Sequence, residues 1–209
     1  MALDEALLEA MPRLQRPLLR CYGWTEPAAT FGYFQKFSEV EAATLLRPLI
    51  RRPTGGGIVP HDADWTYSLA FPAGHDWYEL KAVESYRRVH EWIQNAFAKL
   101  SVATELAPGC KKSLPGQCFV GHEKSDLLWR GKKIAGAAQR RTRDGLLIQG
   151  SVQPPPVRMS RLDWEKAMSE IGSSVLGNLM SFVPDGFLLQ CVDELVRDKY
   201  ASDSHNQKR

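Results

Sequence analysis

The chain has 209 residues, 44% of them hydrophobic and 24% charged, with a formal net charge of +3. This length suffices for one substantial core, and the composition is ordinary for a soluble globular protein. The charge is too small to indicate nucleic-acid binding, and no run approaches the roughly 18 uninterrupted apolar residues of a membrane span. The acidic first residues differ from the basic start of a secretory signal, so we expect a cytoplasmic location.

The cysteines have no spacing that is typical of a metal site. They are Cys21, Cys110, Cys118 and Cys191, without a CxxC pair. We therefore expect free thiols in a reducing compartment and no bound metal. Cys21 and Cys191 are predicted to be core residues.

The first half of the chain shows both helical and strand patterns. Residues 2–11 have helical propensity, and residues 28–34 resemble a strand with a glycine inside. Residues 65–71 alternate in polarity, which predicts a half-buried strand. Apolar side chains fall at helical spacing over 82–100, which predicts the longest helix.

The second half begins with an irregular stretch, 107–124, that is rich in glycine and proline. A three-stranded antiparallel meander is predicted next, with tight turns at Arg130-Gly131 and Asp144-Gly145. Its strands cover 125–129, 132–138 and 146–152.

Two helices are predicted near the end of the chain, at 161–171 after a capping box and at 186–199. The polar tail, 201–209, is expected to be disordered. Strands and helices without strict alternation indicate one α+β domain over 1–200, with a mixed central sheet and flanking helices.

Three successive glycines form the first candidate site, in the run Arg51-Arg52-Pro53-Thr54-Gly55-Gly56-Gly57 that leads to His61-Asp62. Such a loop exposes N–H groups that can wrap an anion or an oxyanion. The arginines add fixed positive charge and paired donors. A flexible surface turn is the competing interpretation. His61 is either a general base that Asp62 orients or a structural hydrogen-bonding group.

A lysine on the meander forms the second candidate site. Strand alternation puts Lys133 on the same face as Ala135 and Ala137, which leaves space above the sheet for a bound group. Gly136 allows a ligand or backbone to approach closely. A solvated lysine beside a hairpin turn is the competing interpretation, which suits Lys132 better.

Cys118 is the third candidate, at the end of the irregular loop and followed by Phe119. Nearby lysines and His122 make its surroundings electropositive, which favours the thiolate. An incidental thiol is the alternative, and Cys110 in the same loop competes for the role.

In this order, the three constellations resemble the family of lipoate–protein ligases, octanoyltransferases and biotin–protein ligases. The stretches RRPTGGGIVPHD and KIAGAAQRR are the most specific, and MALDEALLE, FGYFQ, ESYRRVHEWI and LLIQGS extend the resemblance over nearly the whole chain. The resemblance implies the α+β catalytic domain of this family. It also implies that an acyl carboxyl group lies beside Lys133, close to Gly136 and Ala137.

In this family the glycine loop closes over the acyl group, which implies substrate-binding roles for a set of residues here. They are Arg52, Thr54, Gly55, Gly56, Gly57, His61 and Asp62. The implied acceptor is a lysine of a lipoyl domain or of the glycine-cleavage H protein.

Two mechanisms are known on this scaffold. Ligases activate lipoate with ATP and Mg²⁺ through lipoyl-AMP, whereas octanoyltransferases take octanoate from acyl carrier protein through a cysteine thioester and need no cofactor. One transferase branch carries its cysteine in a CF dipeptide before the lysine strand, as at Cys118-Phe119, so the resemblance favours octanoyl transfer with Cys118 and Lys133 as catalytic residues. Gly57, where that branch usually has arginine, and Gln149, where histidine often stands, are departures.

Two further functions stay open at this stage. The chain could move acyl groups between carrier proteins through a cysteine, or it could bind an acyl group without catalysis. Retention of Lys133 together with a loop cysteine argues against the second.

Overall fold

The computed structural model describes residues 1–111, 119 and 121–208. Within these residues, six strands form one large sheet in the order β1-β5-β9-β8-β7-β6, and three form a small sheet in the order β3-β2-β4. The large sheet consists of β1 (Leu18–Tyr22), β5 (Trp65–Pro72), β6 (Glu105–Leu106), β7 (Leu127–Trp129), β8 (Lys132–Arg141) and β9 (Gly145–Val152). The small sheet consists of β2 (Ala28–Phe31), β3 (Leu49–Arg51) and β4 (Val59–His61). The α+β class is therefore confirmed.

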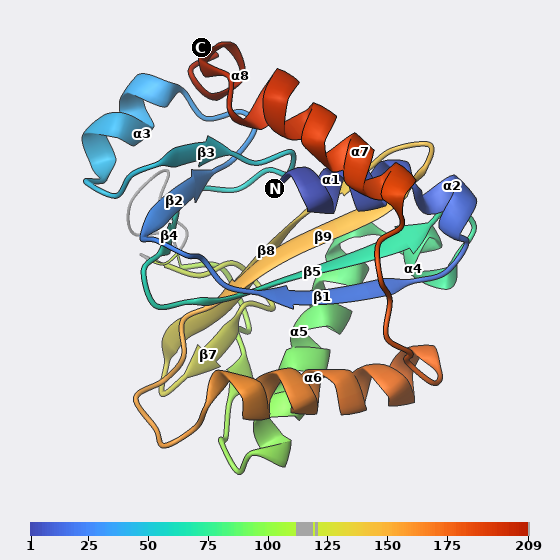
Figure 1. Ribbon diagram of the computed structural model, residues 1–209. Helices are drawn as coiled ribbons and strands as arrows, with labels where there is room; N and C mark the ends of the chain where they lie inside the picture. Colours follow the sequence, from blue (N-terminus) through green and yellow to red (C-terminus); the bar gives the residue numbers. More distant parts are fainter. Residues whose placement is uncertain (112–118, 120, 209) are drawn as a thin grey trace.

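Helices cover both faces of the large sheet (Figure 1). The long helices α5 (Ala82–Lys99) and α6 (Arg161–Leu176) lie on one face. The opposite face carries α1 (Ala2–Glu9), α2 (Met11–Leu14) and α7 (Gly186–Leu195). The remaining helices are α3 (Phe37–Ala43), α4 (Asp76–Glu79), the π-helix η1 (Val196–Tyr200) and α8 (Asp203–Asn206).

Strand pairing differs from the mixed central sheet that we expected. Every strand pair of the large sheet is antiparallel. Tight hairpins connect β7, β8 and β9, and longer connections bring the chain back in the opposite direction elsewhere. Mixed pairing occurs in the small sheet, where β2 runs parallel to β3 and antiparallel to β4. The predicted meander is confirmed as β7, β8 and β9.

Strand β5 is buried on both faces, so the expectation of a half-buried strand is wrong. Tyr67, Leu69 and Phe71 point to the main core under α5 and α6. Ala70, on the other face, packs in a second core with α1 and Leu188 of α7. A central strand that is covered on both sides hides its polar residues as well as its apolar ones.

Part of the tail for which we expect disorder, Asp203–Asn206, forms helix α8. Helix α8 packs beside β3, and Arg51 donates hydrogen bonds to the carbonyl groups of His205 and Asn206 at 3.1 Å each. Arg51 is almost fully buried, so these carbonyl groups satisfy a charged group that would otherwise be costly to bury. No helix among the described residues is long and apolar enough to cross a bilayer. The single domain over 1–200 stays a prediction.

Candidate active site

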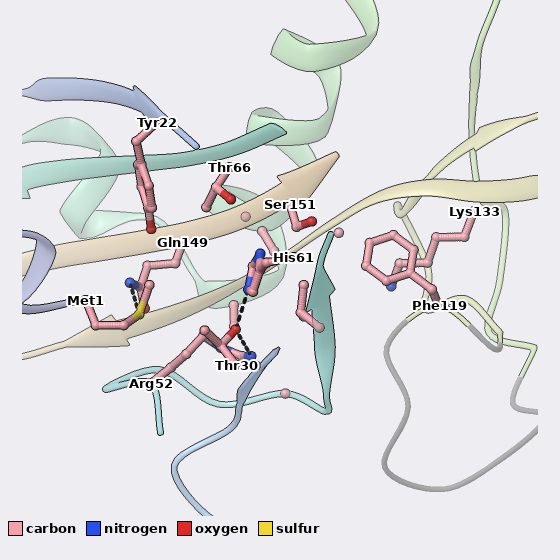
Figure 2. A pocket seen from close by; sticks show the side chains of 16 residues that line it. Met1, Tyr22, Thr30, Arg52, His61, Thr66, Phe119, Lys133, Gln149 and Ser151 are labelled. Carbon is pink, nitrogen blue, oxygen red and sulfur yellow. Dashed lines mark hydrogen bonds between the residues drawn. The ribbon is translucent and has the colours of Figure 1, made fainter. Parts of the chain in front are cut away.

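A pocket lies between the small sheet and the large sheet (Figure 2). The strands β2 and β4 form one side of the pocket, and β8 and β9 form the other. The lining residues are Met1, Tyr22, Thr30, Arg52, Gly56, Val59, His61, Thr66, Phe119, Lys133, Gly136, Ala137, Ala138, Gln149, Gly150 and Ser151.

A bulge in β8 sets the direction of the Lys133 side chain. Leu127 and Leu128 are neighbours on β7, but they pair with Ala135 and Lys133, so Ile134 is an extra residue on β8. An extra residue inverts the alternation of side chains beyond it. The expected shared face of Lys133, Ala135 and Ala137 is therefore wrong.

The Lys133 ammonium instead lies directly over Gly136. A Cβ atom at Gly136 would come within 2.7 Å of both Cε and Nζ of Lys133. Lys133 also forms an ion pair with Asp126, with 2.7 Å between Nζ and Oδ2 and only 8% of the lysine side chain exposed. Lys133 is thus a buried cation in the pocket wall, and the interpretation as a solvated hairpin lysine is wrong.

The Arg52 side chain holds the glycine loop in place by hydrogen bonds to its carbonyl groups. Its Nη2 donates to the carbonyl groups of Gly55 and Gly57, at 2.9 Å each, and its Nη1 donates to Thr30 Oγ1. A residue with a fixed planar fork of donors suits this bridging role. The structure therefore brings Arg52 and Gly56 to the pocket, with Gly55 and Gly57 held beside them.

Gly32 allows the glycine loop to approach β2. A Cβ atom at Gly32 would lie 1.9 Å from the carbonyl oxygen of Gly56, so any other residue would displace the loop. Gly56 itself has a φ of 90°, which favours glycine. The glycine inside the strand-like segment 28–34 was the sequence signal for this close approach.

Thr54 connects the loop to the floor of the pocket. It is buried, and its hydroxyl donates to Gln149 Oε1 at 2.9 Å. Gln149 in turn donates to Asp4 Oδ2 at 2.7 Å. Burial alone would raise the pKa of Asp4, but the charges of the N-terminal ammonium and of Arg20, with hydrogen bonds from Gln149 and Ser68, hold that pKa below its usual value. A charged, fully satisfied carboxylate therefore anchors the chain of contacts that ends at Thr54.

His61 is held by Asp64 and not by Asp62. Asp62 is exposed, whereas Asp64 Oδ2 lies 2.9 Å from His61 Nδ1. On the other side of the ring, Thr30 Oγ1 lies 2.7 Å from His61 Nε2, and the indole of Trp24 stacks 4.2 Å from the imidazole. Because a carboxylate can only accept, the neutral tautomer that fits this arrangement carries its proton on Nδ1, donates to Asp64 and accepts from the Thr30 hydroxyl at Nε2. Both ring nitrogens are engaged, which favours an orienting role for His61 over that of a general base.

Cys118 lies outside the described residues, but Phe119 lines the pocket. The Phe119 ring centroid is 5.3 Å from Lys133 Nζ. Cys110 is exposed, whereas Cys21 and Cys191 are half-buried at the edges of the two cores. Burial raises the pKa of the Cys21 thiol to about 12, so Cys21 is not a reactive thiol at neutral pH.

Comparison with known proteins assigns the chain to a family. Residues 1–153 match the family model described as "Lipoyl protein ligase A/B catalytic domain". The chain belongs to this family. Octanoyltransferase LipM of Carboxydothermus hydrogenoformans is 38% identical over 160 residues, which cover 73% of this chain and 59% of that protein. The match therefore spans less than two thirds of the relative's length.

Solved structures support the fold of the family. The protein Ta0514 from T. acidophilum superposes with a TM-score of 0.79 at 21% identity, over 100% of this chain and 94% of the other. A bi-partite lipoate protein ligase from Thermoplasma acidophilum, described with its E2 lipoyl domain, gives 0.69 at 17% identity, over 98% and 91%. Identities this low establish the shared fold alone.

Proposed function

We propose that the chain is an octanoyltransferase that takes an octanoyl group from acyl carrier protein and delivers it to a lysine of a lipoyl domain or of the glycine-cleavage H protein. The name of the LipM relative supports the class of reaction. The lipoyl domain that accompanies the Thermoplasma ligase supports the acceptor class. The relative is longer than the matched part of this chain, so donor, acceptor and activity are all proposed.

The observation that carries the proposal is the contact between Phe119 and Lys133. The residue directly after Cys118 places its ring 5.3 Å from the Lys133 ammonium, at the wall of the pocket. A lysine ammonium close to a thiol favours the thiolate, which is the natural nucleophile for exchange with a thioester. We therefore assign the nucleophile to Cys118 and charge stabilisation to Lys133.

The chemical steps follow from these two roles. The Cys118 thiolate attacks the carbonyl carbon of the donor thioester, and the carrier thiolate leaves and takes up a proton. The acceptor amine then attacks the octanoyl–Cys118 thioester, which forms the amide and releases the Cys118 thiol. Lys133 donates to the oxyanion of each tetrahedral intermediate. The two thioesters are similar in energy, so no ATP is required.

An ATP-dependent lipoate–protein ligase is the second candidate. Gly57 favours it, because a third glycine at this place is usual in ligases of the family that the chain resembles. In a ligase, lipoate would attack the α-phosphate of Mg²⁺-bound ATP to give lipoyl-AMP and pyrophosphate, and the acceptor amine would then displace AMP.

Two parallel transfer reactions distinguish the candidates. One mixture contains octanoyl–acyl carrier protein and an apo lipoyl domain without ATP, and the other contains lipoate, ATP, Mg²⁺ and the same domain. We expect the acceptor to gain an octanoyl mass in the first mixture only. Transfer confined to the second mixture would identify a ligase.

A further inference from the structure

Asp126 joins two side chains from different elements under the pocket. Its Oδ2 accepts from Lys133 Nζ at 2.7 Å, and its Oδ1 accepts a short hydrogen bond from the Tyr86 hydroxyl of α5. The Asp126 side chain has no exposed surface. A buried carboxylate is stable only when its oxygens are paired with donors or cations, and here both are.

The backbone fixes Asp126 independently of Lys133. Its amide donates to the carbonyl of Glu123, and its Oδ2 accepts from the Glu123 amide at 2.7 Å. Ala107 donates to the Asp126 carbonyl at 2.8 Å. The backbone therefore fixes the Asp126 carboxylate, which in turn orients the long, flexible side chain of Lys133.

Tyr86 retains its proton and acts as a donor. Burial, and then the charge of Asp126, hold the pKa of Tyr86 well above its usual value. The hydroxyl can thus satisfy Oδ1 permanently, which keeps the plane of the carboxylate from turning. Oδ2 then stays aimed at the ammonium.

Two further residues lie against the Lys133 ammonium besides Asp126. Gly136 lies below Nζ, and the Phe119 ring lies 5.3 Å from it. An ammonium has three donor protons. Asp126 is the single carboxylate paired with Lys133 in the described part of the chain, and the same ammonium lines the pocket.

We propose that Asp126 and Tyr86 are positioning residues that aim the Lys133 ammonium at the acyl carbonyl, through an ordered contact Tyr86–Asp126–Lys133. The kinetic part of this inference rests on the proposed function, whereas the contact itself does not. A role in folding alone predicts lost stability with unchanged turnover. The positioning role predicts lost turnover in a folded protein.

Spectra of the lysine ammonium groups test the contact without any activity. In a ¹H–¹⁵N spectrum selective for lysine side chains, the buried pair should give a slowly exchanging signal that Lys133→Met removes. Asp126→Asn should abolish the signal and Tyr86→Phe should shift or broaden it. Tyr78→Phe is the matched control, because it removes a hydroxyl that donates to the Thr142 carbonyl away from the pocket. A missing wild-type signal, or one unchanged by Tyr86→Phe, would overturn the inference.

Octanoyl transfer measured with the same variants tests the kinetic part. Loss of one donor to a developing oxyanion typically lowers kcat by roughly 10²–10³-fold. We expect a loss in this range for Asp126→Asn and about 10-fold for Tyr86→Phe, with unchanged KM for the donor and with cooperative unfolding that shows both variants to be folded. Equal losses in Tyr86→Phe and Tyr78→Phe would overturn it. No turnover by the wild type with either donor refutes the proposed function, while the spectra still decide the contact.

Discussion

At the residue scale, Lys133 combines charge with burial in a way that surface lysines do not. Its side chain is 8% exposed, and its one ion pair among the described residues is with Asp126. The sequence indicated the importance of Lys133 through the KIAGAAQRR stretch, but the bulge at Ile134 could not be read from alternation. Asp126 and Asp64 were missed, because a carboxylate in a strand-like or loop segment has no distinguishing spacing.

Replacing Lys133 with methionine should abolish the stabilisation of the oxyanion while keeping most of the side-chain volume. We expect octanoyl transfer to fall by roughly 10²–10³-fold, as for other single oxyanion donors. The neighbouring Lys132 is exposed, so Lys132→Met is the matched control and should transfer at the wild-type rate. Near-normal turnover in a folded Lys133→Met variant would refute the assigned role.

His90 predicts how stability depends on pH. Burial lowers the pKa of this histidine to about 4, and its Nδ1–H donates to the Tyr86 carbonyl at 2.8 Å. An unfolded histidine titrates near 6.5. Below that pH the unfolded chain binds a proton that the folded chain does not, so folding stability falls as the pH drops from about 6.5 to about 4.

Urea unfolding at pH 7 and pH 5 measures this effect. The shift of His90 alone corresponds to a loss of about 2 kcal/mol over that interval. His90→Phe, which retains an aromatic ring beside Tyr86, should lack this part of the loss. An equal fall in unfolding free energy for wild type and His90→Phe would contradict the prediction.

At the element scale, local sequence patterns predicted the helices and the meander. The same patterns did not predict which other elements cover them. The helix expected over 82–100 is α5 at Ala82–Lys99, and the one expected over 161–171 extends to Leu176 as α6. The predicted helix 186–199 ends as α7 at Leu195 and continues as the π-helix η1. The strand 28–34 ends at Phe31, because Gly32 begins the turn that meets the glycine loop.

Gly32→Ala should disturb the pocket by pushing the glycine loop away from β2. The added Cβ atom would lie 1.9 Å from the Gly56 carbonyl oxygen, and neither backbone can yield without breaking hydrogen bonds. Overpacking of this kind typically costs 1–3 kcal/mol, about the loss that we expect in unfolding free energy, together with weaker acyl binding. Gly186→Ala, where the Cβ atom meets open space, is the control and should unfold like the wild type. Equal stability of the two variants would contradict the close approach.

At the scale of the whole molecule, the pocket is assembled from segments far apart in the chain. The small sheet supplies Thr30 and His61, and the large sheet supplies Lys133 and Gln149 (Figure 2). The family resemblance predicted that the glycine loop and Lys133 would meet, and the structure brings both to one pocket. The periodicity of apolar residues cannot predict that two distant segments line one pocket, because it indicates which face of an element is buried and not what covers that face.

The arginine pair after the lysine strand also shows that a sequence pattern does not reveal which groups a side chain contacts. The sequence alone suggests Arg140 and Arg141, just beyond the lysine strand, as basic contacts for an acidic acceptor surface, with a solvated pair at a hairpin end as the alternative. In the structure Arg140 pairs with Glu5 at 3.7 Å, and Arg141 donates to the Tyr78 carbonyl and to Ser85 Oγ. Both side chains thus have partners within the fold, which argues against the prediction that they contact the acceptor.

The central claim is that Cys118 carries the octanoyl group during transfer, and the intact mass of the protein tests it most directly. The wild type and Cys110→Ser should each gain one octanoyl mass from octanoyl–acyl carrier protein without ATP, and hydroxylamine should remove it. Cys118→Ser should gain no hydroxylamine-sensitive mass. Wild-type transfer by Cys118→Ser, dependent on ATP and free lipoate, would contradict the claim and identify a ligase.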